Sequence, residues 1–340
     1  MKAAIFDPYL DTLGGGERYC MAFAEMLIKK GWQVDVEWKD SSIKENFKQR
    51  FGTDLDGINF IPDIKKGSGY DLCFWVSDGS IPLLHSRKNI LLFQIPFHDV
   101  DGRTLFNKMK LIRINHSICY SNFVKGVIDK EYGINSKVVY PPVETIKIRP
   151  KRKENLITYV GRFSQLTQSK GQEILVKTFK RFEKQYPDWK LILAGGGGVG
   201  AGNYIDKLKK ESEGHNIKVI ESLDFETLLD IYGKAKIFWC AAGFGISEKT
   251  NPERLEHFGM TTVEAMAAGA VPLVFNAGGQ KEIVENGVSG ITWNSTGELL
   301  KLTIKLIEEK GSIRMFSQKA RQRSTFFSYE RFEKEISSLI

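Results

Sequence analysis

The segment LITYVGRFSQLTQSKGQEILVKTFKRFEKQYPDWKLILA, residues 156–194, decides the fold of this chain. Its two ends, Leu156–Val160 and Lys190–Ala194, are short apolar runs with the length and composition of buried strands. The residues between them include Gly171–Tyr186, which has the pattern of an amphipathic helix. A strand, a helix and a second strand in this order predict a parallel sheet with a helix packed against it.

The same alternation extends over most of the chain. In the first half, Tyr19, Phe23 and Leu27 lie on one face of an expected helix at Gly15–Lys30, and another helix is expected at Ser121–Tyr132. The strands expected there are Lys2–Phe6, Gln33–Trp38, Asp71–Val76, Asn89–Ile95, Ser117–Tyr120 and Lys137–Tyr140. The elements expected after residue 194 are Tyr204–Glu213, Lys218–Ile220, Phe225–Ala235, Ile237–Ala241, Thr261–Ala268, Val271–Phe275 and a tail helix at Ser328–Ile340.

Pro141, Pro142 and the basic stretch that runs to Lys153 interrupt this alternation. We therefore predict an α/β fold with two Rossmann-like, doubly wound domains, residues 1–145 and 146–325, and a final helical segment, 326–340. Two such domains side by side bring the carboxyl ends of their strands around one cleft, where open α/β sheets bind ligands. The loops that follow strands are therefore the places to look for function.

Length and composition exclude several classes of protein. The 340 residues are enough for two domains of about 100–200 residues each. A hydrophobic content of 42% with 26% charged residues is ordinary for a globular protein, and excludes a disordered chain, a collagen and a coiled coil. No apolar run reaches the ~18–20 residues of a membrane span, and the N-terminus lacks the layout of a signal peptide. We expect a cytoplasmic protein.

The cysteines and the charges point away from further classes. Cys20, Cys73, Cys119 and Cys240 are far apart and form no CxxC pair, which argues against a zinc site or a disulfide framework. The 49 basic and 41 acidic side chains give a net charge of +8. The excess is spread out, with 21 basic and 18 acidic side chains in residues 1–150 and 28 and 23 in residues 151–340. An even spread does not predict a nucleic-acid-binding face.

Two glycine-rich loops are candidate ligand contacts. Gly14, Gly15 and Gly16 stand between the first strand and the first helix, where glycine lets the backbone approach a ligand and a helix N-terminus offers N–H groups to an anion. Gly278 and Gly279 occupy a similar place after the strand expected at 271–275. The first loop fits a phosphate or sugar contact and fits a plain tight turn equally well, because it matches neither GxGxxG nor a P-loop.

Two cations follow the first strand of the second domain. Arg162 comes directly after that strand, and Lys170 precedes the next helix. Arginine can hold a diphosphate through two parallel hydrogen bonds, and lysine can act as a point charge. Their position at the end of a strand favours a diphosphate site over two ordinary surface cations.

The segment NPERLEHFGMTTVEAM, residues 251–266, combines carboxylates with a helix N-terminus. Glu256 is expected in a loop and Glu264 in the first turns of the following helix. The N–H groups of that N-terminus belong to Phe258, Gly259, Met260, Thr261 and Thr262. They can hold a phosphate while the carboxylates accept hydrogen bonds from sugar hydroxyls. The alternative is that Glu256 is an ordinary surface carboxylate and that Glu264 is a glutamate in the first turns of the helix, stabilised there by the helix dipole.

Taken in order, these motifs resemble those of glycosyltransferase family 4, whose members are retaining enzymes of the GT-B fold. The motifs are Gly-Gly-Gly-Glu-Arg at 14–18, Ser-Asn-Phe at 121–123, Val-Tyr-Pro-Pro-Val at 139–143, Gly-Arg-Phe at 161–163 with Lys-Gly at 170–171, Glu-x7-Glu at 256–264 and Gly-Gly-x-x-Glu at 278–282. The resemblance covers essentially the whole chain. The form Glu256-His257-Phe258-Gly259 is similar to that of lipid-linked-oligosaccharide α-1,2-mannosyltransferases.

The resemblance implies a donor site in the second domain. Arg162 and Lys170 would contact the donor diphosphate, Glu256 the hydroxyls of the donor sugar, and Glu264 the ribose. The N–H groups around residues 258–262 would meet the sugar and the diphosphate. The donor-binding set also includes Gly278 and Gly279.

The resemblance also implies contributions from the first domain. Gly15 and Gly16 would approach the diphosphate or the acceptor. His98 would lie near the anomeric carbon, and its alternative role is that of a structural loop histidine. The last segment would cross back to the first domain. Its apolar residues Phe326, Phe327, Phe332 and Ile336 are expected to be buried.

The implied reaction moves a sugar with retention from a nucleotide-sugar donor, GDP-mannose first and a UDP-sugar second. The acceptor would be a hydroxyl of a glycan, a lipid-linked molecule or a small molecule. No carboxylate stands out as a nucleophile. The resemblance implies a same-face substitution, in which the departing phosphate helps to deprotonate the acceptor hydroxyl. Neither a metal ion nor a cofactor is expected, and nucleic acid is not an expected partner. The alternative is a non-catalytic nucleotide-sugar-binding or glycan-binding protein of the same fold.

A lipid-linked acceptor would require a basic and apolar patch on the first domain. The residues that can form one are Phe106, Lys108, Met109, Lys110, Ile112 and Arg113. Such a patch would lie on a membrane interface, here the inner face of the membrane. The alternative, which we favour at this point, is a half-buried helix.

Overall fold

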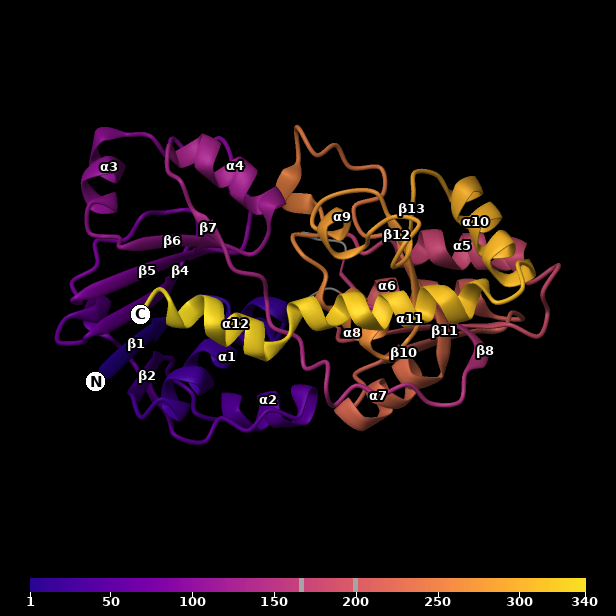
Figure 1. Cartoon of the computed structure of the whole chain (residues 1–340), viewed down its shortest axis with the longest axis horizontal. Helices are drawn as coiled ribbons and strands as arrows, with labels where there is room; N and C mark the ends of the chain where they lie inside the picture. Colours follow the sequence, from indigo (N-terminus) through magenta and orange to yellow (C-terminus); the bar gives the residue numbers. More distant parts are fainter. Residues whose placement is uncertain (165–167, 198–200) are drawn as a thin grey trace. The chain divides into compact units, whose positions relative to one another are not determined.

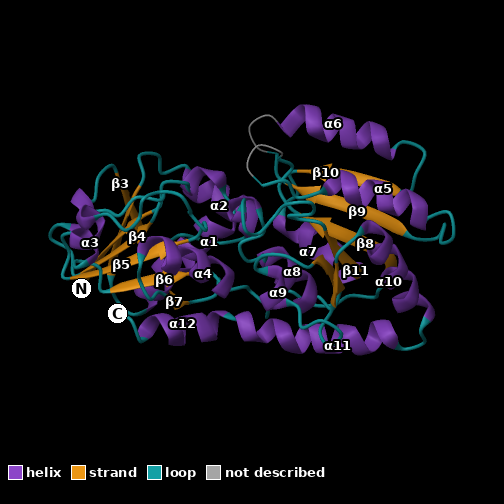
Figure 2. Ribbon diagram, turned by 90° about the horizontal axis from the view of Figure 1, so that it is seen from above, coloured by secondary structure: helices purple, strands orange, loops and turns teal. Residues whose placement is uncertain are grey.

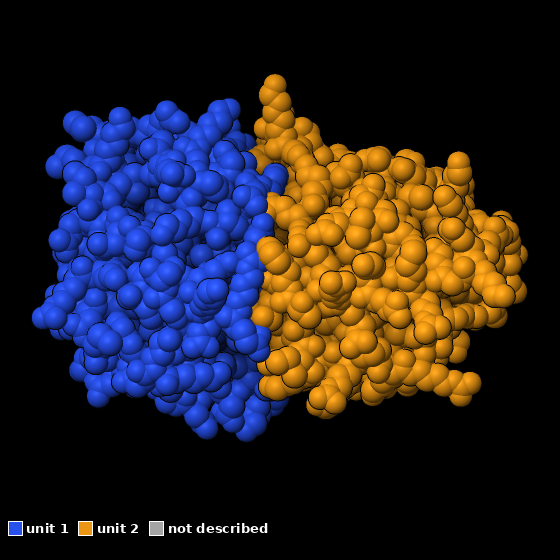
Figure 3. Space-filling model, in the orientation of Figure 1, with its two compact units in different colours: residues 1–142, 329–340 blue, residues 143–328 orange. Residues whose placement is uncertain are grey.

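The computed structural model describes residues 1–164, 168–197 and 201–340, and these form two compact units (Figure 3). Unit 1 contains residues 1–142 and 329–340, and unit 2 contains residues 143–328. The chain therefore enters unit 2 three residues before the expected boundary after residue 145, and returns to unit 1 at residue 329 rather than 326.

Unit 1 is built on a seven-stranded parallel sheet with the order β3-β2-β1-β4-β5-β6-β7. Figure 1 labels β1, β2 and β4 to β7 of this sheet. Its strands are β1 (Lys2–Phe6), β2 (Gln33–Glu37), β3 (Ile58–Ile61), β4 (Leu72–Val76), β5 (Lys88–Phe93), β6 (His116–Cys119) and β7 (Lys137–Val138). Its α-helices are α1 (Gly15–Lys29), α2 (Ile43–Phe51), α3 (Leu105–Leu111), α4 (Asn122–Tyr132) and α12 (Tyr329–Ser337). The strand order reverses between β1 and β4, which is the switch point at which such sheets bind ligands.

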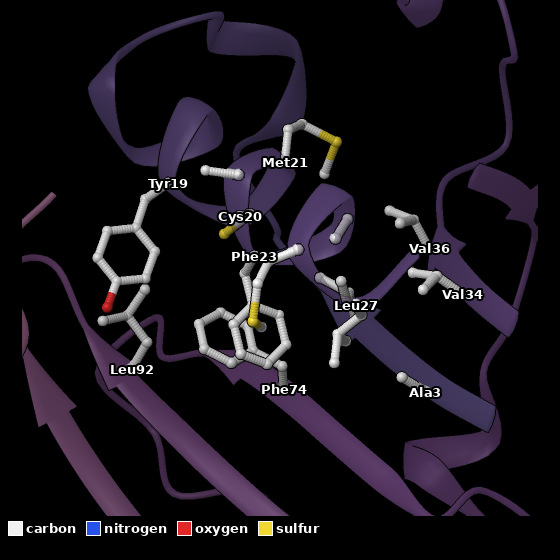
Figure 4. Close-up of a cluster of buried hydrophobic side chains, with 14 of the residues drawn as sticks. Ala3, Tyr19, Cys20, Met21, Phe23, Leu27, Val34, Val36, Phe74 and Leu92 are labelled. Atoms are coloured by element: carbon white, nitrogen blue, oxygen red, sulfur yellow. The ribbon is translucent and has the colours of Figure 1, made fainter. Parts of the chain in front are cut away.

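The apolar face of α1 packs on the strands of unit 1, as its spacing predicts (Figure 4). The ring of Phe23 stacks on that of Phe74 from β4, with 4.1 Å between their centroids. Phe332 and Ile336 of α12 belong to the same core, so the end of the chain completes unit 1. A buried aromatic pair of this kind adds about 0.5–1.5 kcal/mol to the contribution of its buried area.

Two expectations about exposure are wrong. Phe326 is 39% exposed, because its ring packs against Phe327 and the Arg323 guanidinium rather than in a core. Phe327, Phe332 and Ile336 are buried as expected. Helix α3 contains no buried residue, so it is not the half-buried helix that was favoured.

The described part of unit 2 contains a six-stranded parallel sheet with the order β10-β9-β8-β11-β12-β13. Its strands are β8 (Glu154–Val160), β9 (Lys190–Gly195), β10 (Ile217–Glu221), β11 (Ala235–Cys240), β12 (Val271–Phe275) and β13 (Ile291–Trp293). Its α-helices are α5 (Gln172–Phe182), α6 (Ala201–Ser212), α7 (Phe225–Lys234), α8 (Met260–Ala267), α9 (Gln280–Ile283), α10 (Thr296–Glu308) and α11 (Ser312–Ser324). Helices α5, α6 and α10 pack on one face, and α7, α8 and α11 on the other (Figure 2).

The prediction of two Rossmann-like parallel sheets is confirmed, and the segment 156–194 forms the expected strand, helix and strand as β8, α5 and β9. The order of the second sheet reverses between β8 and β11. The loops after these two strands are therefore the ligand positions of unit 2. Within the described residues, every helix is too short or too polar to cross a membrane.

Candidate active site

At the switch point of unit 2, two oppositely charged side chains from different loops form an ion pair. Lys170 follows β8 and Glu256 follows β11, and Lys170 Nζ lies 2.9 Å from Glu256 Oε2. Lys170 is only 8% exposed, so water screens this ion pair little. Removing two ions from water costs several kcal/mol, which only close geometry offsets. The pair is therefore a candidate functional group rather than an ordinary surface ion pair.

Opposing effects act on the Glu256 carboxyl. Burial is the largest and raises its pKa, but the positive charges of Lys170 and Arg162 favour the ionised form, and the pKa falls below its ordinary value. Glu256 is therefore ionised at neutral pH. Among the described residues, no carboxylate forms an ion pair with the Arg162 guanidinium. The Arg162 guanidinium thus adds a positive charge beside the Lys170–Glu256 pair, which suits an anionic ligand.

Gln168 braces this pair, and the sequence did not reveal it. Its Oε1 accepts a hydrogen bond from Lys170 Nζ at 3.1 Å, and its Nε2 donates to the Leu255 carbonyl at 2.7 Å. Gln168 Nε2 also lies 2.9 Å from Nε2 of His257, whose pKa burial lowers to about 4. The neutral ring can accept that bond, or in its other tautomer donate to the Glu253 carbonyl at 3.0 Å. No sequence motif marks a glutamine in this role.

The N-terminus of α8 begins at a glycine in the left-handed region. Gly259 has φ 112°, a conformation that L side chains rarely adopt, and the helix starts at Met260. The first-turn N–H groups of Met260 and Thr261 have no intrahelical acceptor, as in any helix. They lie four and five residues after Glu256. The N–H groups that could bind an anion are therefore close in the chain to the carboxylate of the ion pair.

Gly278 and Gly279 hold the Glu256 loop in place. A Cβ on Gly278 would lie 2.4 Å from the Glu256 carbonyl oxygen, and one on Gly279 would lie 2.4 Å from the His257 carbonyl oxygen. The Gly279 N–H donates to the Glu256 carbonyl at 2.8 Å. Glu248, which the sequence did not single out, accepts from the Gly278 N–H at 2.7 Å. The glycine pair is thus needed for loop packing, whatever it contributes to donor binding.

Glu264 lies in the interior of unit 2 and is 4% exposed. Its Oε2 accepts a hydrogen bond from the Tyr232 hydroxyl at 2.9 Å. Nearby in the sequence, Thr262 Oγ1 is buried, and within the described residues it has no hydrogen-bond partner. Gln280 Oε1, at the start of α9, is also buried and has no hydrogen-bond partner among the described residues. Buried polar atoms without partners are rare enough to mark a region shaped by something besides packing.

The glycine-rich loop of unit 1 is closely packed rather than open. A Cβ on Gly16 would lie 2.2 Å from Gln94 Oε1, and the Tyr120 hydroxyl donates to the Gly16 carbonyl at 3.1 Å. The Glu17 carboxylate accepts a hydrogen bond from the Gly14 N–H. Gly15, the first residue of α1, remains exposed. Part of the anion-binding capacity of this helix N-terminus is therefore used by its own glutamate.

A second carboxyl group lies beside this loop. Asp7 directly follows β1 and is 1% exposed. Burial, and then the charge of Glu17, raise the pKa of Asp7 from 3.8 to about 7. Two carboxyl groups next to the loop disfavour the binding of a diphosphate there, and they are compatible with a ligand that carries hydroxyl groups. The position of Asp7 after a buried strand was the available signal, although no motif included it.

His98 lies in the loop after β5, and its side chain is 29% exposed. Its Nδ1 is 2.8 Å from Oδ2 of Asp99. A carboxylate on Nδ1 favours the tautomer with a proton there, which leaves Nε2 as an acceptor. In the described residues, no group of three or more His, Cys, Asp or Glu side chains has the arrangement of a metal site.

The structure therefore sorts the predicted residues into two groups. In unit 2, the charges of Lys170 and Arg162 both act on the Glu256 carboxyl, and the loop of Gly278 and Gly279 packs against that of Glu256. Glu264 follows on α8 but is bound to Tyr232. The other group, Gly15, Gly16 and His98, belongs to unit 1.

Known proteins resemble the chain over part or all of its length. A relative from Dictyostelium discoideum, GDP-Man:Man(3)GlcNAc(2)-PP-Dol alpha-1,2-mannosyltransferase, is 25% identical over 248 residues, which are 68% of this chain and 47% of the relative. The chain spans about half the length of the curated relatives that it matches first.

Two solved structures share the fold. A glycosyltransferase from Rickettsia africae ESF-5 has a TM-score of 0.79 at 16% identity, over 99% of this chain and 97% of that one. Anabaena Alr3699/HepE in complex with UDP-glucose has a TM-score of 0.74 at 17% identity, over 99% and 98%. These likenesses confirm the expected GT-B fold.

A family model covers the unit that holds the ion pair. The model for glycosyl transferases group 1 matches residues 144–323, which is more than half of the chain. The matched residues include Arg162, Lys170, Glu256 and the α8 N-terminus. Sheet order, loop positions and this match agree, and the chain belongs to the glycosyl transferases group 1 family.

Proposed function

We propose that this protein is a retaining glycosyltransferase that needs no metal ion and takes a nucleotide-sugar donor. The observation that carries the proposal is the buried Lys170–Glu256 ion pair at the β8–β11 switch point, beside the N-terminus of α8. GDP-mannose is the first candidate donor and a UDP-sugar the second. The mannosyltransferase relative and the UDP-glucose complex of HepE support these two candidates by their names. Membership of glycosyltransferase family 4 is part of the proposal.

In the proposed mechanism, the donor diphosphate lies against Arg162, Lys170 and the first-turn N–H groups of α8. Breaking the bond between the anomeric carbon and the phosphate oxygen leaves negative charge on the phosphate, which these groups stabilise. Glu256 accepts hydrogen bonds from the sugar hydroxyls while its pairing with Lys170 holds it ionised. Glu264 contacts the ribose.

The acceptor hydroxyl attacks the anomeric carbon on the face from which the diphosphate leaves. Its proton passes to the departing phosphate oxygen, so the new glycosidic bond keeps the configuration of the donor. The loop at Gly15 and Gly16 serves the acceptor rather than the diphosphate, because the Glu17 carboxylate already accepts a hydrogen bond from the Gly14 N–H and its charge would repel an anion. His98 assists near the anomeric carbon.

The test is release of nucleoside diphosphate from GDP-mannose, UDP-glucose, UDP-N-acetylglucosamine, UDP-galactose and ADP-glucose, each with and without EDTA and a set of hydroxyl acceptors. We expect one donor to be turned over at the same rate with EDTA, and NMR of the product to show the donor's anomeric configuration. Inversion, or dependence on a metal ion, would contradict that part of the mechanism. If calorimetry shows that a donor binds, but none of the acceptors leads to its turnover, the non-catalytic alternative is favoured.

A further inference from the structure

Helix α3 exposes an unusual amount of apolar surface on unit 1. On the helix, Leu105 is 76% exposed, Phe106 66% and Met109 59%, and the C-cap residue Ile112 directly after it is 82% exposed. Leu105, Met109 and Ile112 are spaced at i, i+4 and i+7, so they lie along one face of the helix. Four large apolar side chains on two turns form a contiguous patch, which monomeric proteins rarely leave exposed without a use.

The opposite side of α3 attaches it to the protein. Leu111 is partly buried and packs against the core cluster that includes Phe93 and Tyr132. After the helix, the Arg113 guanidinium donates to the Leu84 and Ser86 carbonyls, at 3.3 and 3.4 Å. The apolar face is therefore held outward by contacts on the other side. It is a fixed surface and not a frayed end.

Positive charge flanks the apolar face on both sides. Lys108 and Lys110 lie on the helix on either side of the apolar stripe, and the Lys110 ammonium lies 4.3 Å from the centroid of the Phe106 ring. Residues 102–128 contain five Lys and Arg side chains and no Asp or Glu. Lys88, His116 and Lys137 begin the three neighbouring strands β5, β6 and β7. The charge of Lys137 and Lys88 adds to burial in lowering the pKa of His116.

This surface lies at the amino edge of the sheet, since α3 ends five residues before β6 begins (Figure 1). The loops with Gly15, Gly16 and His98 follow strands, at the carboxyl edge of the same sheet. A strand rises about 3.3 Å per residue, so about 15–20 Å of sheet separates the two edges. A ligand on α3 would therefore leave the carboxyl edge of unit 1 accessible.

We propose that α3 docks unit 1 onto an anionic lipid surface. An apolar face flanked by lysines is the arrangement of helices that lie in the plane of a membrane interface. The apolar side chains enter the boundary between headgroups and acyl chains, and the cations meet anionic headgroups. This proposal does not depend on glycosyl transfer, because it rests on α3 alone.

The test is co-sedimentation with vesicles of phosphatidylcholine, with and without phosphatidylglycerol. We expect the whole protein to bind the anionic vesicles at least about tenfold more strongly than the neutral ones, and less strongly at high salt. The variant Leu105→Ser/Ile112→Ser should lower binding at least about tenfold, because each serine removes exposed apolar area and no core contact. Lys108→Glu/Lys110→Glu should lower binding to anionic vesicles only.

The matched control is Ile146→Ser/Met315→Ser, which removes two apolar side chains that are 61% and 53% exposed in unit 2. It should bind vesicles as the wild type does, and all variants should keep the wild-type melting temperature. Absence of wild-type binding at low salt, or unchanged binding of the α3 serine variant, would overturn the proposal. A wild-type dimer that the α3 serines convert to a monomer, without vesicle binding, would instead identify a second copy of this chain as the occupant.

Discussion

The two sheets end in loops of similar topology but opposite electrostatic character. At the switch point of unit 2, Lys170 neutralises Glu256 and Arg162 adds a positive charge. At that of unit 1, Asp7 is buried near Glu17 and has a pKa of about 7. The topology determines where a ligand can bind, and the loop side chains determine its charge. A cationic and an acidic loop suit a diphosphate donor and a hydroxyl acceptor respectively.

The glycines in the loops of the two units also differ, in the kind of atom that packs against them. Gly279 lies against backbone atoms of residues 257 and 258, which cannot move without the Glu256 loop. Gly16 lies against the end of the Gln94 side chain, which can rotate away. The loops of unit 2 are therefore fixed to one another more firmly than the glycine loop of unit 1 is fixed to its neighbour.

The largest expected effect is that of Lys170→Ala. Loss of this cation should lower turnover about 100- to 1000-fold, because it removes a group that stabilises the leaving phosphate. It also leaves Glu256, whose side chain is 18% exposed, without its ion-pair partner, which should cost up to about 3–5 kcal/mol of unfolding free energy. Initial rates and urea unfolding measure the two effects.

Two further variants separate these effects. Lys170→Ala/Glu256→Ala should recover much of the stability without recovering activity, because neither charge is then left alone. Lys177→Ala, an exposed lysine on α5, should change neither quantity. Near-normal turnover of the single variant would remove Lys170 from the proposed site.

The next effect concerns Asp7 and depends on pH. The folded protein holds the Asp7 proton more tightly than the unfolded chain, since the pKa rises from 3.8 to about 7. The free energy of unfolding is therefore highest, as far as Asp7 is concerned, below about pH 4, and it falls as the pH rises to about 7 and Asp7 loses its proton. Asp7→Asn stays neutral, so it should be about 2–4 kcal/mol more stable than the wild type at about pH 8 and similar to it below about pH 4.

Urea unfolding of wild type and Asp7→Asn at several pH values measures this difference. Asp56→Asn, which changes an exposed aspartate, should follow the wild-type pH dependence. Parallel curves for wild type and Asp7→Asn would show that Asp7 is not a buried acid, and would remove the electrostatic contrast between the two units.

A smaller effect tests the glycine contrast. Gly279→Ala should cost about 1–3 kcal/mol, because its Cβ would overlap backbone atoms. Gly16→Ala should cost less, because only the end of Gln94 must move. Gly202→Ala on α6, where no atom lies within 4 Å of the added Cβ, should be stabilising by up to about 1 kcal/mol. Thermal unfolding of the three variants gives the order, and a greater cost at Gly16 than at Gly279 would reverse the comparison.

The smallest effect concerns Glu264. Glu264→Gln should weaken nucleoside diphosphate binding about tenfold if the carboxylate accepts hydrogen bonds from the ribose. Tyr232→Phe removes the hydroxyl that Glu264 binds in the structure and is the matched control. Calorimetry that gives the two variants the same dissociation constant would assign Glu264 to packing with Tyr232 instead of ribose binding.

The sequence was sufficient for most of the fold and for the charged residues of the site. Strand β1 and strand β12 begin and end where the apolar runs predict, because buried parallel strands are marked by continuous apolar residues. Lys170 was recognised from its place between a strand and the next helix, and Glu256 from its place in the loop before a helix N-terminus and in the Glu-x7-Glu motif. Their contact at 2.9 Å could not be predicted, since it joins residues 86 positions apart through loop conformations.

The missed features depend on tertiary contacts. Gln168 belongs to no motif and acts only through Lys170, His257 and Leu255 once the loops are folded. The apolar residues of α3 have the spacing of a half-buried helix, and periodicity alone does not say whether such a face meets a core or remains exposed. Phe326, two residues after the end of α11, illustrates the same limit.

Calorimetric titration of GDP, UDP and ADP into the wild type and Lys170→Ala/Glu256→Ala tests whether the Lys170–Glu256 pair belongs to the nucleotide-binding site. The double variant leaves no unpaired buried ion, so it separates binding from folding. We predict that at least one nucleotide binds the wild type, and that the double variant weakens this binding at least about tenfold while Lys177→Ala does not. Equal affinity of wild type and double variant, or no binding of any nucleotide to the wild type, would contradict it.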